Sequence, residues 1–512
     1  MAGPVRVNWP TCDEDGCIGI HLRAGDKCVA HAGDEERDAA LEQIAQTGRI
    51  DARGVTISST LLKRILDSTP GDPDGPAVPA KARFNGATFQ GDAEFDEAIF
   101  QGDARFDEAT FQGDAGFTEA TFQGGARFNR ATFQRGAGFN GATFQGDATF
   151  HGAAFERAQQ FGPLLAHEQL NLDVARFAQP VRIEASTISI CCRRARFPGG
   201  VQFRLRWADV VLDDTDIPVP SLLTGISLLA SERLALAERR IARDWERKDA
   251  GHVSEQPRLL SLQRANVAGL GLANVDLAYC RFSGAHNLDK LRLEADVAFK
   301  LSPARVGWEQ RQVIAEECTW RADRPRSGRW AAPWWPSPAD PSWSWPNDLE
   351  EPIALGPGAI AGLYRALRKS REDAKDEPGA ADFYYGEMEM RRRAHGRGDH
   401  GDGGSRGRVD RGVLTTYWLV SGYGLRAWRA LAWLVGITVV FALAFHLVGF
   451  TRPPQPASYW TSLLYAFRST ISLTDDQVTL TAWGQLLQAL LRLTGPILLG
   501  LALLALRGRV KR

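Results

Sequence analysis

The amino-acid sequence predicts a mainly β solenoid joined to α-helices, two of which are long and apolar enough to cross a membrane. Two observations carry this prediction. Phenylalanine recurs at alternating intervals of five and six residues between Ala82 and Phe155, and two mostly apolar stretches of 21 residues, 430–450 and 486–506, lie near the C-terminus. Strict internal repetition indicates stacked coils, and 21 residues at about 1.5 Å each cover the roughly 30 Å hydrocarbon layer of a bilayer.

The repeat is the feature around which the chain is organised. Each repeated phenylalanine has an alanine two positions before it, from Ala82 to Ala153, and the intervals never break their alternation. We expect these rings to form one core ladder, which comprises Phe84, Phe89, Phe95, Phe100, Phe106, Phe111, Phe117, Phe122, Phe128, Phe133, Phe139, Phe144, Phe150 and Phe155.

An α-helix is the first alternative for an 11-residue period, because right-handed coiled coils have that period. At about 100° per residue, however, steps of five and six residues place successive phenylalanines about 140° and 240° apart, on two stripes instead of one face. Residues 80–160 also contain twelve glycines, and each would cost about 1 kcal/mol inside a helix. We therefore reject the helix.

In an extended segment, alternate residues share a face, so the alanine and phenylalanine of each Ala-x-Phe unit point inward together. The stretches between them, such as Gln90-Gly91-Asp92, have the composition of turns. This pattern resembles the pentapeptide-repeat family. The resemblance implies a right-handed quadrilateral β-helix, with alanine under the corners and phenylalanine along the axis; the chain differs from the family in the extra residue of every second unit.

Composition limits the classes of function. The 512 residues carry 61 basic and 61 acidic side chains, and residues 80–160 have a net charge of −4 from 7 basic and 11 acidic ones. This balance gives no general attraction for nucleic acid. Seven scattered cysteines fit a reducing compartment better than a disulfide framework. Because the first ten residues lack an apolar signal-peptide core, we expect the N-terminal part in the cytoplasm.

Residues 1–33 contain four side chains suited to binding a metal, namely Cys12, Cys17, Cys28 and His31. The spacing Cys-x4-Cys-x10-Cys-x2-His offers the four ligands of a tetrahedral zinc knuckle, which would hold together a segment too short for its own core. Isolated thiols are the alternative. With four protein ligands, the zinc would have no open position and would be structural.

The regions around the repeat follow from changes of pattern. We expect a helix and solenoid N-cap over 34–80, the β-helix over 81–220, a helical excursion over 221–257 beginning at Ser221, and a second pentapeptide-repeat run over 258–300. Seven tryptophans and six prolines between 308 and 346 exclude regular structure. They predict a connector over 301–357, whose indoles dock on the rod or at the membrane interface.

Residues 358–393 predict two amphipathic helices and resemble the juxtamembrane segment of membrane-bound pentapeptide-repeat proteins. No base, nucleophile or phosphate loop accompanies Glu387 and Glu389, so we interpret them as solvated helix charge and expect no catalytic residue. Residues 394–412 are rich in Gly, Arg and Asp and predict a flexible linker.

Residues 413–512 form the expected membrane domain. Basic residues flank the outer ends of the two spans, whereas the connecting loop has only Arg452 and Arg468, opposed by Asp475 and Asp476. The positive-inside rule therefore places both termini in the cytoplasm. The loop also contains an apolar segment, 458–473, that predicts a re-entrant helix. Span, re-entrant helix and span resemble the two-helix pore module of potassium-type channels, although the Gly-Tyr-Gly filter is replaced in this loop by Leu-Thr-Asp-Asp.

The channel resemblance implies pore candidates in and beside this loop: Thr470, Ser472, Asp475, Asp476, Arg468 and Arg492. Arg492 lies inside the second span, where a charge costs at least about 2.5 kcal/mol. Either a functional role or anchoring at the outer interface explains it.

These observations favour a non-catalytic membrane protein, in which a cytoplasmic rod binds a protein partner or senses a signal and is tethered to a channel-like domain in the lipid bilayer. The alternative is a homo-oligomeric ion-conducting pore gated by the rod. A DNA-mimicking topoisomerase inhibitor, known among soluble pentapeptide-repeat proteins, ranks below both, because the rod is only mildly acidic and is tethered. We expect no nucleic-acid partner.

Overall fold

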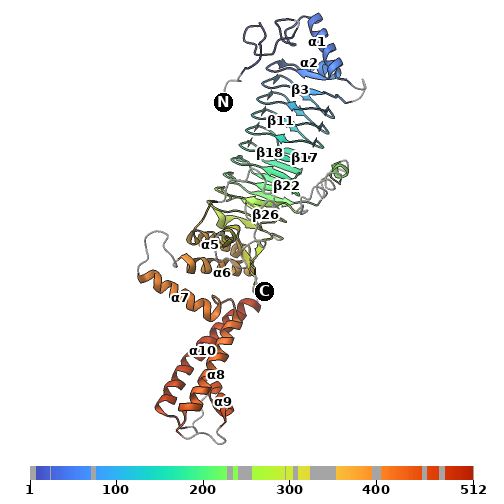
Figure 1. The fold of residues 1–512 in the computed structure, drawn as a ribbon. Coiled ribbons are helices and arrows are strands. Elements are labelled where there is room, and N and C mark those ends of the chain that lie inside the picture. Colours follow the sequence, from blue (N-terminus) through green and yellow to red (C-terminus); the bar gives the residue numbers. More distant parts are fainter. Residues whose placement is uncertain are drawn as a thin grey trace. The chain divides into compact units, whose positions relative to one another are not determined.

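The computed structural model describes residues 7–23, 25–70, 76–227, 234–239, 256–294, 296–303, 310–322, 353–394, 405–451, 458–471 and 479–510. The chain forms two compact units, Met1–Leu355 with Lys369–Lys375, and Gly356–Arg368 with Asp376–Arg512. Figure 1 shows stacked β coils in the first unit and helices in the second.

The first unit is a β-solenoid whose stacked strands pair in parallel. Within the repeat, each residue pairs with the residue 22 positions further on, as Ala82 does with Ala104 and Phe89 with Phe111. One coil therefore contains two 11-residue repeats, or four Ala-x-Phe units, and each unit supplies one face. The predicted solenoid of pentapeptide repeats is confirmed.

Four ladders of strands make up the faces of the solenoid. The first face contains β1 (Arg49–Asp51), β3 (Lys81–Arg83), β7 (Ala104–Arg105), β11 (Ala126–Arg127), β15 (Ala148–Thr149), β18 (Gln169–Asn171), β21 (Ser189–Cys191), β23 (Asp209–Val211) and β25 (Arg258–Ser261). The second contains β2 (Thr56–Ile57), β4 (Thr88–Phe89), β8 (Thr110–Phe111), β12 (Thr132–Phe133), β16 (Ala154–Phe155) and β19 (Arg176–Phe177). The third contains β5 (Ala93–Glu94), β9 (Ala115–Gly116) and β13 (Ala137–Gly138). The fourth contains β6 (Ile99–Phe100), β10 (Thr121–Phe122), β14 (Thr143–Phe144), β17 (Gln160–Ala166), β20 (Val181–Ser186), β22 (Val201–Arg206), β24 (Ser221–Gly225), β26 (Leu270–Ala273) and β27 (Arg292–Leu293).

The fourteen repeat phenylalanines fill the interior of the coils, each at most 1% exposed. Rings one coil apart stack face to face: the centroids of Phe89 and Phe111 lie 4.7 Å apart, with 3° between the ring planes. Rings on neighbouring faces also meet edge to face, as Phe111 and Phe117 do at 6.1 Å. The core is therefore a continuous aromatic column.

One kind of corner requires a left-handed backbone. The N–H of Ala87 donates to the carbonyl of Phe84 at 3.0 Å, and Gly86 has a φ of 65°, as the third residue of a type II turn must. At the equivalent corner of the next coil the left-handed residue is Glu108, with a φ of 59°. Its N–H donates to the carbonyl of Asn129 in the coil beyond, at 2.7 Å, so pairing between coils holds this conformation.

The number of residues per coil changes in the second half of the solenoid. Between β18 and β24, paired residues lie 20 positions apart. Ser221–Gly225 is strand β24, paired with β22 and β26, so the helical excursion does not begin at Ser221 as expected. Side chains 221–224 alternate between buried and half-buried, as in a strand with one face toward the core. Of the inserted segment, residues 234–239 are helical and pack Leu234 against Leu165.

Helices and short strands close both ends of the solenoid. At the N-terminal end lie α1 (Asp34–Thr47), within the predicted segment 34–80, and α2 (Ser59–Asp67), whose first turn is capped by the Ser58 side chain. At the other end lie the 3-10 helix η1 (Leu288–Lys290), the antiparallel pair β28 (Lys300–Leu301) and β29 (Gln312–Val313), and α4 (Ala315–Ala322).

Helix α4 corrects the prediction that the Trp/Pro-rich segment has no regular structure. It forms because the six prolines of that segment all lie at position 325 or beyond, so none of them interrupts residues 315–322. Trp320 lies in α4, and the other six tryptophans lie outside the described residues.

The second unit is helical. It contains α5 (Pro357–Asp373, of which Lys369 onward belongs to the first unit), α6 (Glu377–Ala394), α7 (Ser405–Ser421), α8 (Ala427–Ala444), the π-helical turn η4 (Phe445–Gly449), α9 (Tyr459–Thr470) and α10 (Ala482–Val510). The predicted linker 394–412 is too long, because α7 already begins at Ser405. Helix α7 is stabilised by packing against α6 and α8, which outweighs the low helix propensity of its glycines.

Candidate functional site

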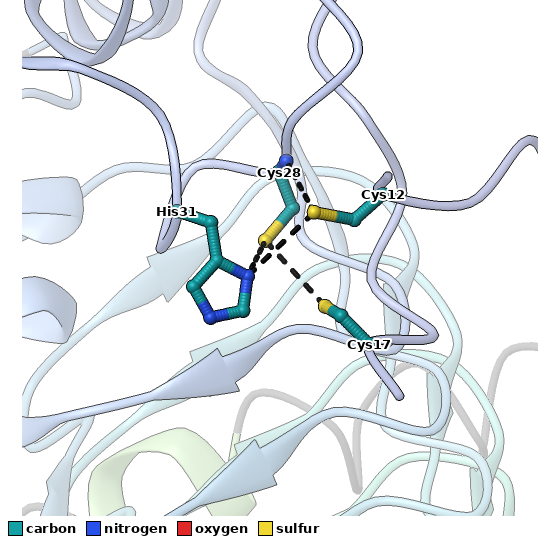
Figure 2. A group of neighbouring side chains, drawn as sticks. All are labelled: Cys12, Cys17, Cys28 and His31. Atoms are coloured by element: carbon teal, nitrogen blue, oxygen red, sulfur yellow. Dashed lines mark hydrogen bonds between the residues drawn. The ribbon is translucent and has the colours of Figure 1, made fainter. Parts of the chain in front are cut away.

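A Cys/His knuckle lies at the N-terminal end of the first unit and brings together the predicted ligands Cys12, Cys17, Cys28 and His31. Figure 2 shows the three sulfurs and the imidazole converging. An antiparallel bridge between Thr11 and Ile20 brings the first two cysteines close. A turn in which the N–H of His31 donates to the carbonyl of Cys28 at 3.0 Å places the other two ligands together.

The ligand atoms have the spacing of a tetrahedral zinc site. The sulfurs of Cys12 and Cys28 lie 3.6 and 3.5 Å from Nδ1 of His31, and the sulfur of Cys17 lies 3.9 Å from that of Cys28. Zn–S bonds of about 2.3 Å and Zn–N bonds of about 2.0–2.1 Å at tetrahedral angles separate two sulfurs by about 3.8 Å and a sulfur and a nitrogen by about 3.6 Å. All four ligand atoms lie within 4.8 Å of one another, so the four residues fit a tetrahedral zinc ion with small side-chain shifts.

Backbone N–H groups point at two of the sulfurs. Gly19 donates to Cys17 at 3.4 Å, and Cys28 donates to Cys12 at 3.3 Å. Burial opposes ionisation of Cys12, but hydrogen bonds from the backbone and from His31 lower the pKa of its thiol to about 7. Burial raises the pKa of the Cys28 thiol to about 12. A bound cation would replace the proton on each thiol, because cysteine binds metals as thiolate.

The knuckle covers the first corner of the solenoid. The N–H of Ile20 donates to the carbonyl of Arg53 at 2.8 Å, and the Arg53 guanidinium lies 5.4 Å from the centroid of the Trp9 ring. Gly54 has a φ of 66°, and a Cβ there would lie 2.4 Å from the carbonyl oxygen of Ile18. The knuckle is thus part of the cap that covers the solenoid end.

On the outer surface of the rod, polar side chains bond from coil to coil. Asn85, Asp107, Asn129 and His151 occupy one position in four successive coils. The amides of Asn85 and Asn129 donate to the Asp107 carboxylate at 2.9 and 2.8 Å, and the N–H of His151 donates to Oδ1 of Asn129 at 3.2 Å. The sequence pattern alone does not single out this ladder. Its members are 22 positions apart in the sequence, but this spacing places them in one row only once a coil is known to contain 22 residues.

Beside the ladder lies an exposed ion pair. Nη1 of Arg130 is 3.0 Å from Oε1 of Glu108, and the Arg130 side chain is 71% exposed, so the pair contributes at most about 1 kcal/mol to stability. These two residues line a shallow cavity of about 380 Å³ together with three ladder residues, Asp107, Asn129 and His151. We call this the ladder cavity. Its lining is polar and carries both charges, which suits a polar partner better than an apolar ligand.

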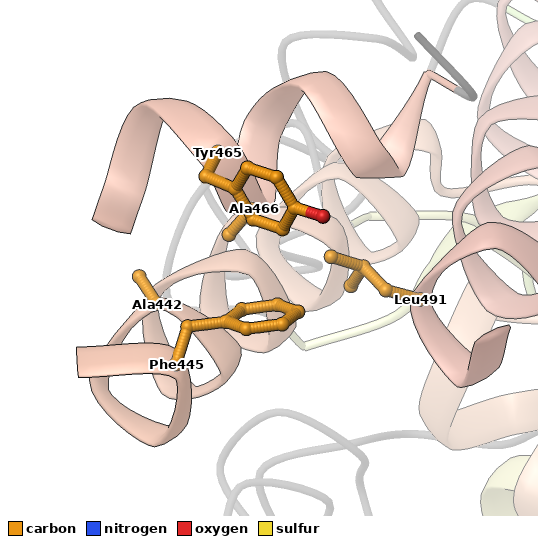
Figure 3. Close-up of a cluster of buried hydrophobic side chains, with 5 residues drawn as sticks. All are labelled: Ala442, Phe445, Tyr465, Ala466 and Leu491. Atoms are coloured by element: carbon orange, nitrogen blue, oxygen red, sulfur yellow. The ribbon is translucent and has the colours of Figure 1, made fainter. Parts of the chain in front are cut away.

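Two helical segments of the second unit are long and apolar enough to cross a membrane, Ala427–Gly449 and Ala482–Leu503, with mean hydropathies of 2.3 and 1.7. Helix α9 packs against both, and Figure 3 shows their shared buried cluster, Ala442, Phe445, Tyr465, Ala466 and Leu491. A Cβ on Gly495 of α10 would lie 2.4 Å from the carbonyl oxygen of Thr470. The three helices therefore form one tightly packed module.

The structure describes three of the six pore candidates. Thr470 is buried at the end of α9, where its hydroxyl donates to the carbonyl of Ala466 at 2.8 Å and lies 3.4 Å from the Thr438 hydroxyl. Arg468 is exposed on α9, and Arg492 is half-buried on α10. Within the described residues, Thr470 hydrogen-bonds neither arginine. Ser472, Asp475 and Asp476 lie outside the described residues.

Glu387 of α6 is buried, so its interpretation as solvated helix charge is wrong. It is 1% exposed and lies 3.1 Å from Nε of Arg365 and 3.5 Å from Nη1 of Arg368, both on α5, and it also pairs with Arg391. Close packing of the two helices explains the burial, since a Cβ on Gly386 would lie 2.7 Å from the Tyr364 ring.

Glu389 is likewise buried, at 6% exposure. It pairs with Arg392 at 2.9 Å and with Arg393 at 3.0 Å, and it accepts a hydrogen bond from the Tyr423 hydroxyl at 3.2 Å. Tyr423 lies between α7 and α8. Glu389 therefore ties α6 to the segment that enters the first candidate span.

Comparison with known proteins identifies the repeat and nothing beyond it. A family model described as pentapeptide repeats (9 copies) matches residues 80–121 and 117–159. No curated protein and no solved structure matches the chain.

Proposed function

We propose that this chain is an integral membrane protein whose rod binds a protein partner in the cytoplasm and is tethered by α8 and α10. One observation carries the proposal: a solenoid with an aromatic-filled interior is joined in one chain to two helices apolar enough to span a bilayer. Because phenylalanine fills the coils of the repeat, we assign binding to the outer surface, as in other repeat proteins.

The charge distribution supports a cytoplasmic rod. Arg426 precedes the first candidate span and Arg429 lies in its first turn, whereas Arg507 and Arg509 follow the second span. The cytoplasmic side of a membrane is the side on which such basic flanks accumulate. Both termini, and with them the rod, are therefore assigned to the cytoplasm.

The ladder cavity is the surface that we assign to the partner. It presents the exposed Glu108–Arg130 pair beside a rigid polar ladder. Arg105 and Arg127 end the strands β7 and β11, two positions before Asp107 and Asn129, which lie in the turns that follow. A protein surface that carries both charges would complement this patch.

Photo-crosslinking of the full-length chain in native membranes tests the assignment. p-Benzoylphenylalanine in place of Arg130 should capture one protein of defined mass. The matched control replaces Asn140, an exposed residue 11 positions after Asn129 and therefore half a coil away. Equal capture at both positions, or none at Arg130, would contradict the proposal. Turnover of a nucleotide or metabolite by the purified chain would contradict its non-catalytic character.

We also propose that the Cys/His knuckle binds zinc as a structural ion. The match between its interatomic distances and tetrahedral geometry supports the assignment. Elemental analysis of the purified chain should find one zinc per chain, lost in Cys28→Ser and kept in Cys192→Ser, which replaces a buried cysteine of the solenoid. Zinc absent from the unaltered protein would refute the assignment.

A second function, a homo-oligomeric ion-conducting pore, is favoured by α9. This helix of 12 residues is capped by the side chain of Ser458 and packs against both candidate spans. Planar-bilayer recordings of the purified oligomer should then show a conductance that changes when Asp475 and Asp476 are both replaced by alanine. A correctly folded oligomer that does not conduct would exclude a pore.

A further inference from the structure

Helix α7 has an apolar face that the described residues leave uncovered. Val409 and Val413, one turn apart, are 63% and 62% exposed, and Leu419 is 46% exposed near the edge of the same face. On the opposite side, Trp418 packs toward α6, where its Nε1 donates to the Tyr385 hydroxyl at 3.1 Å. The Trp418 side of α7 therefore packs on α6, whereas the side that carries Val409 and Val413 is left uncovered by the described residues.

Two hydrogen bonds fix α7 at the beginning of α8. Nη1 of Arg429 donates to the carbonyl of Trp418 at 3.0 Å, and Nε1 of Trp433 donates to the carbonyl of Leu419 at 3.2 Å. Residues 422–424 between the helices all have left-handed φ angles, from 56° to 76°. The C-terminal end of α7, which includes Leu419, thus lies beside the first turns of α8, where a span passes from headgroups to acyl chains.

Aromatic and basic side chains gather at the same level. The guanidinium groups of Arg392 and Arg429 lie 4.5 and 4.8 Å from the centroid of the Trp418 ring, and that of Arg426 lies 5.0 Å from the Tyr385 ring. Tryptophan is enriched where a span meets the interface, and basic side chains next to a span attract anionic lipid headgroups. A helix that combines an exposed apolar face with such surroundings has the properties of an interfacial helix.

We propose that α7 lies in the surface of an anionic bilayer, with Val409, Val413 and Leu419 at the boundary between headgroups and acyl chains and with Arg426 and Arg429 beside lipid phosphates. Continuity with α8 and complementary charge identify the bilayer as the occupant of this face. The inference rests on the proposed insertion of α8 and α10 in the membrane.

Lipid photo-crosslinking tests the interfacial position of α7 separately from the membrane insertion of α8 and α10. The full-length chain, reconstituted in vesicles of phosphatidylcholine and phosphatidylglycerol, carries p-benzoylphenylalanine in place of Val413, of Val440 or of Gln112. Val440 is a 64% exposed residue of α8, and Gln112 is an exposed residue of the rod. Phospholipid adducts at Val413 and Val440, but not at Gln112, are expected.

Each other outcome contradicts a defined part of the account. Adducts at Val440 without adducts at Val413 would overturn the interfacial α7 and leave the membrane insertion standing. No adduct at either position would overturn both. Capture of a second copy of the chain at Val413 would identify another protomer as the occupant, and would also overturn the inference.

The proposed contact between the arginines and anionic lipid headgroups can be tested separately. Retention of phosphatidylglycerol over phosphatidylcholine by the purified full-length chain should fall roughly fivefold in Arg426→Gln, because one basic residue at an anionic surface contributes about that factor. Arg135→Gln, at an exposed position of the rod outside the ladder cavity, should leave retention unchanged. Equal retention of the two lipids by the unaltered chain would refute the role of the arginines.

Discussion

Replacing Phe111 by alanine is the sharpest test of the aromatic column. The ring is fully buried, and its centroid lies 4.7 Å from that of Phe89 and 4.8 Å from that of Phe133, its neighbours one coil away. Removing a buried phenylalanine costs about 3–5 kcal/mol, and both stacked contacts disappear with it. The unit that contains Phe111 comprises Met1–Leu355 and Lys369–Lys375. At about 2.1 cal/mol/K per residue its entropy of unfolding is about 0.76 kcal/mol/K, so a loss of about 4 kcal/mol should lower its melting temperature by roughly 5 °C.

Hydrogen exchange of the full-length chain locates the effect, because coils in a solenoid depend mainly on their neighbours. Phe111→Ala should lower amide protection in the coils that contain residues 89–133 more than elsewhere. The matched control is Gln112→Ala, which removes the exposed side chain of the next residue and should leave protection and melting unchanged. Equal losses in the two variants would refute the inward orientation of the phenylalanines.

Three further predictions concern the stability of the rod. Gly113→Ala should destabilise its coil, because the new Cβ would lie 2.4 Å from the backbone of Gly91. The control Gly138→Ala should be neutral, because no atom lies closer than 3.7 Å to its new Cβ. Equal melting temperatures for these variants would contradict the close stacking of the coils. A strong zinc chelator should lower the melting temperature of the full-length chain but not that of Cys28→Ser, and an equal shift in both would show that the chelator acts elsewhere. Burial raises the pKa of Glu316 to about 7, from 4.5, so the folded protein holds this proton more tightly than the unfolded chain, and stability should fall by up to about 3 kcal/mol as pH rises from 4.5 to 7. Glu316→Gln should remove that part of the pH dependence in urea titrations, and an unchanged slope would contradict the assignment.

The repeat could be predicted from the sequence because one physical requirement, an inward small residue followed two positions later by an inward ring, recurs without interruption. The Cys/His ligands could be identified for a similar reason, since few combinations of residues within 20 positions suit a tetrahedral metal. In both cases the residues that make the determining contacts lie close together along the chain.

Other features depend on contacts that spacing does not reveal. Glu387 is buried because Gly386 lets α5 approach α6, and that approach is a property of two helices together. Helix α7 begins at Ser405 in a glycine-containing stretch because it packs on neighbouring helices. Strand β24 follows the period of the solenoid, while its run of leucines suits a helix equally well.

Protease digestion of sealed membrane vesicles tests the central claim most directly. In right-side-out vesicles, the solenoid should survive, and the connection between α8 and α10 should be the exposed part of the chain. In inverted vesicles, the solenoid should be cut, and the chain should resist extraction at alkaline pH. Digestion of the solenoid in right-side-out vesicles, or release of the intact chain by alkaline extraction, would contradict a cytoplasmic rod tethered by two membrane spans.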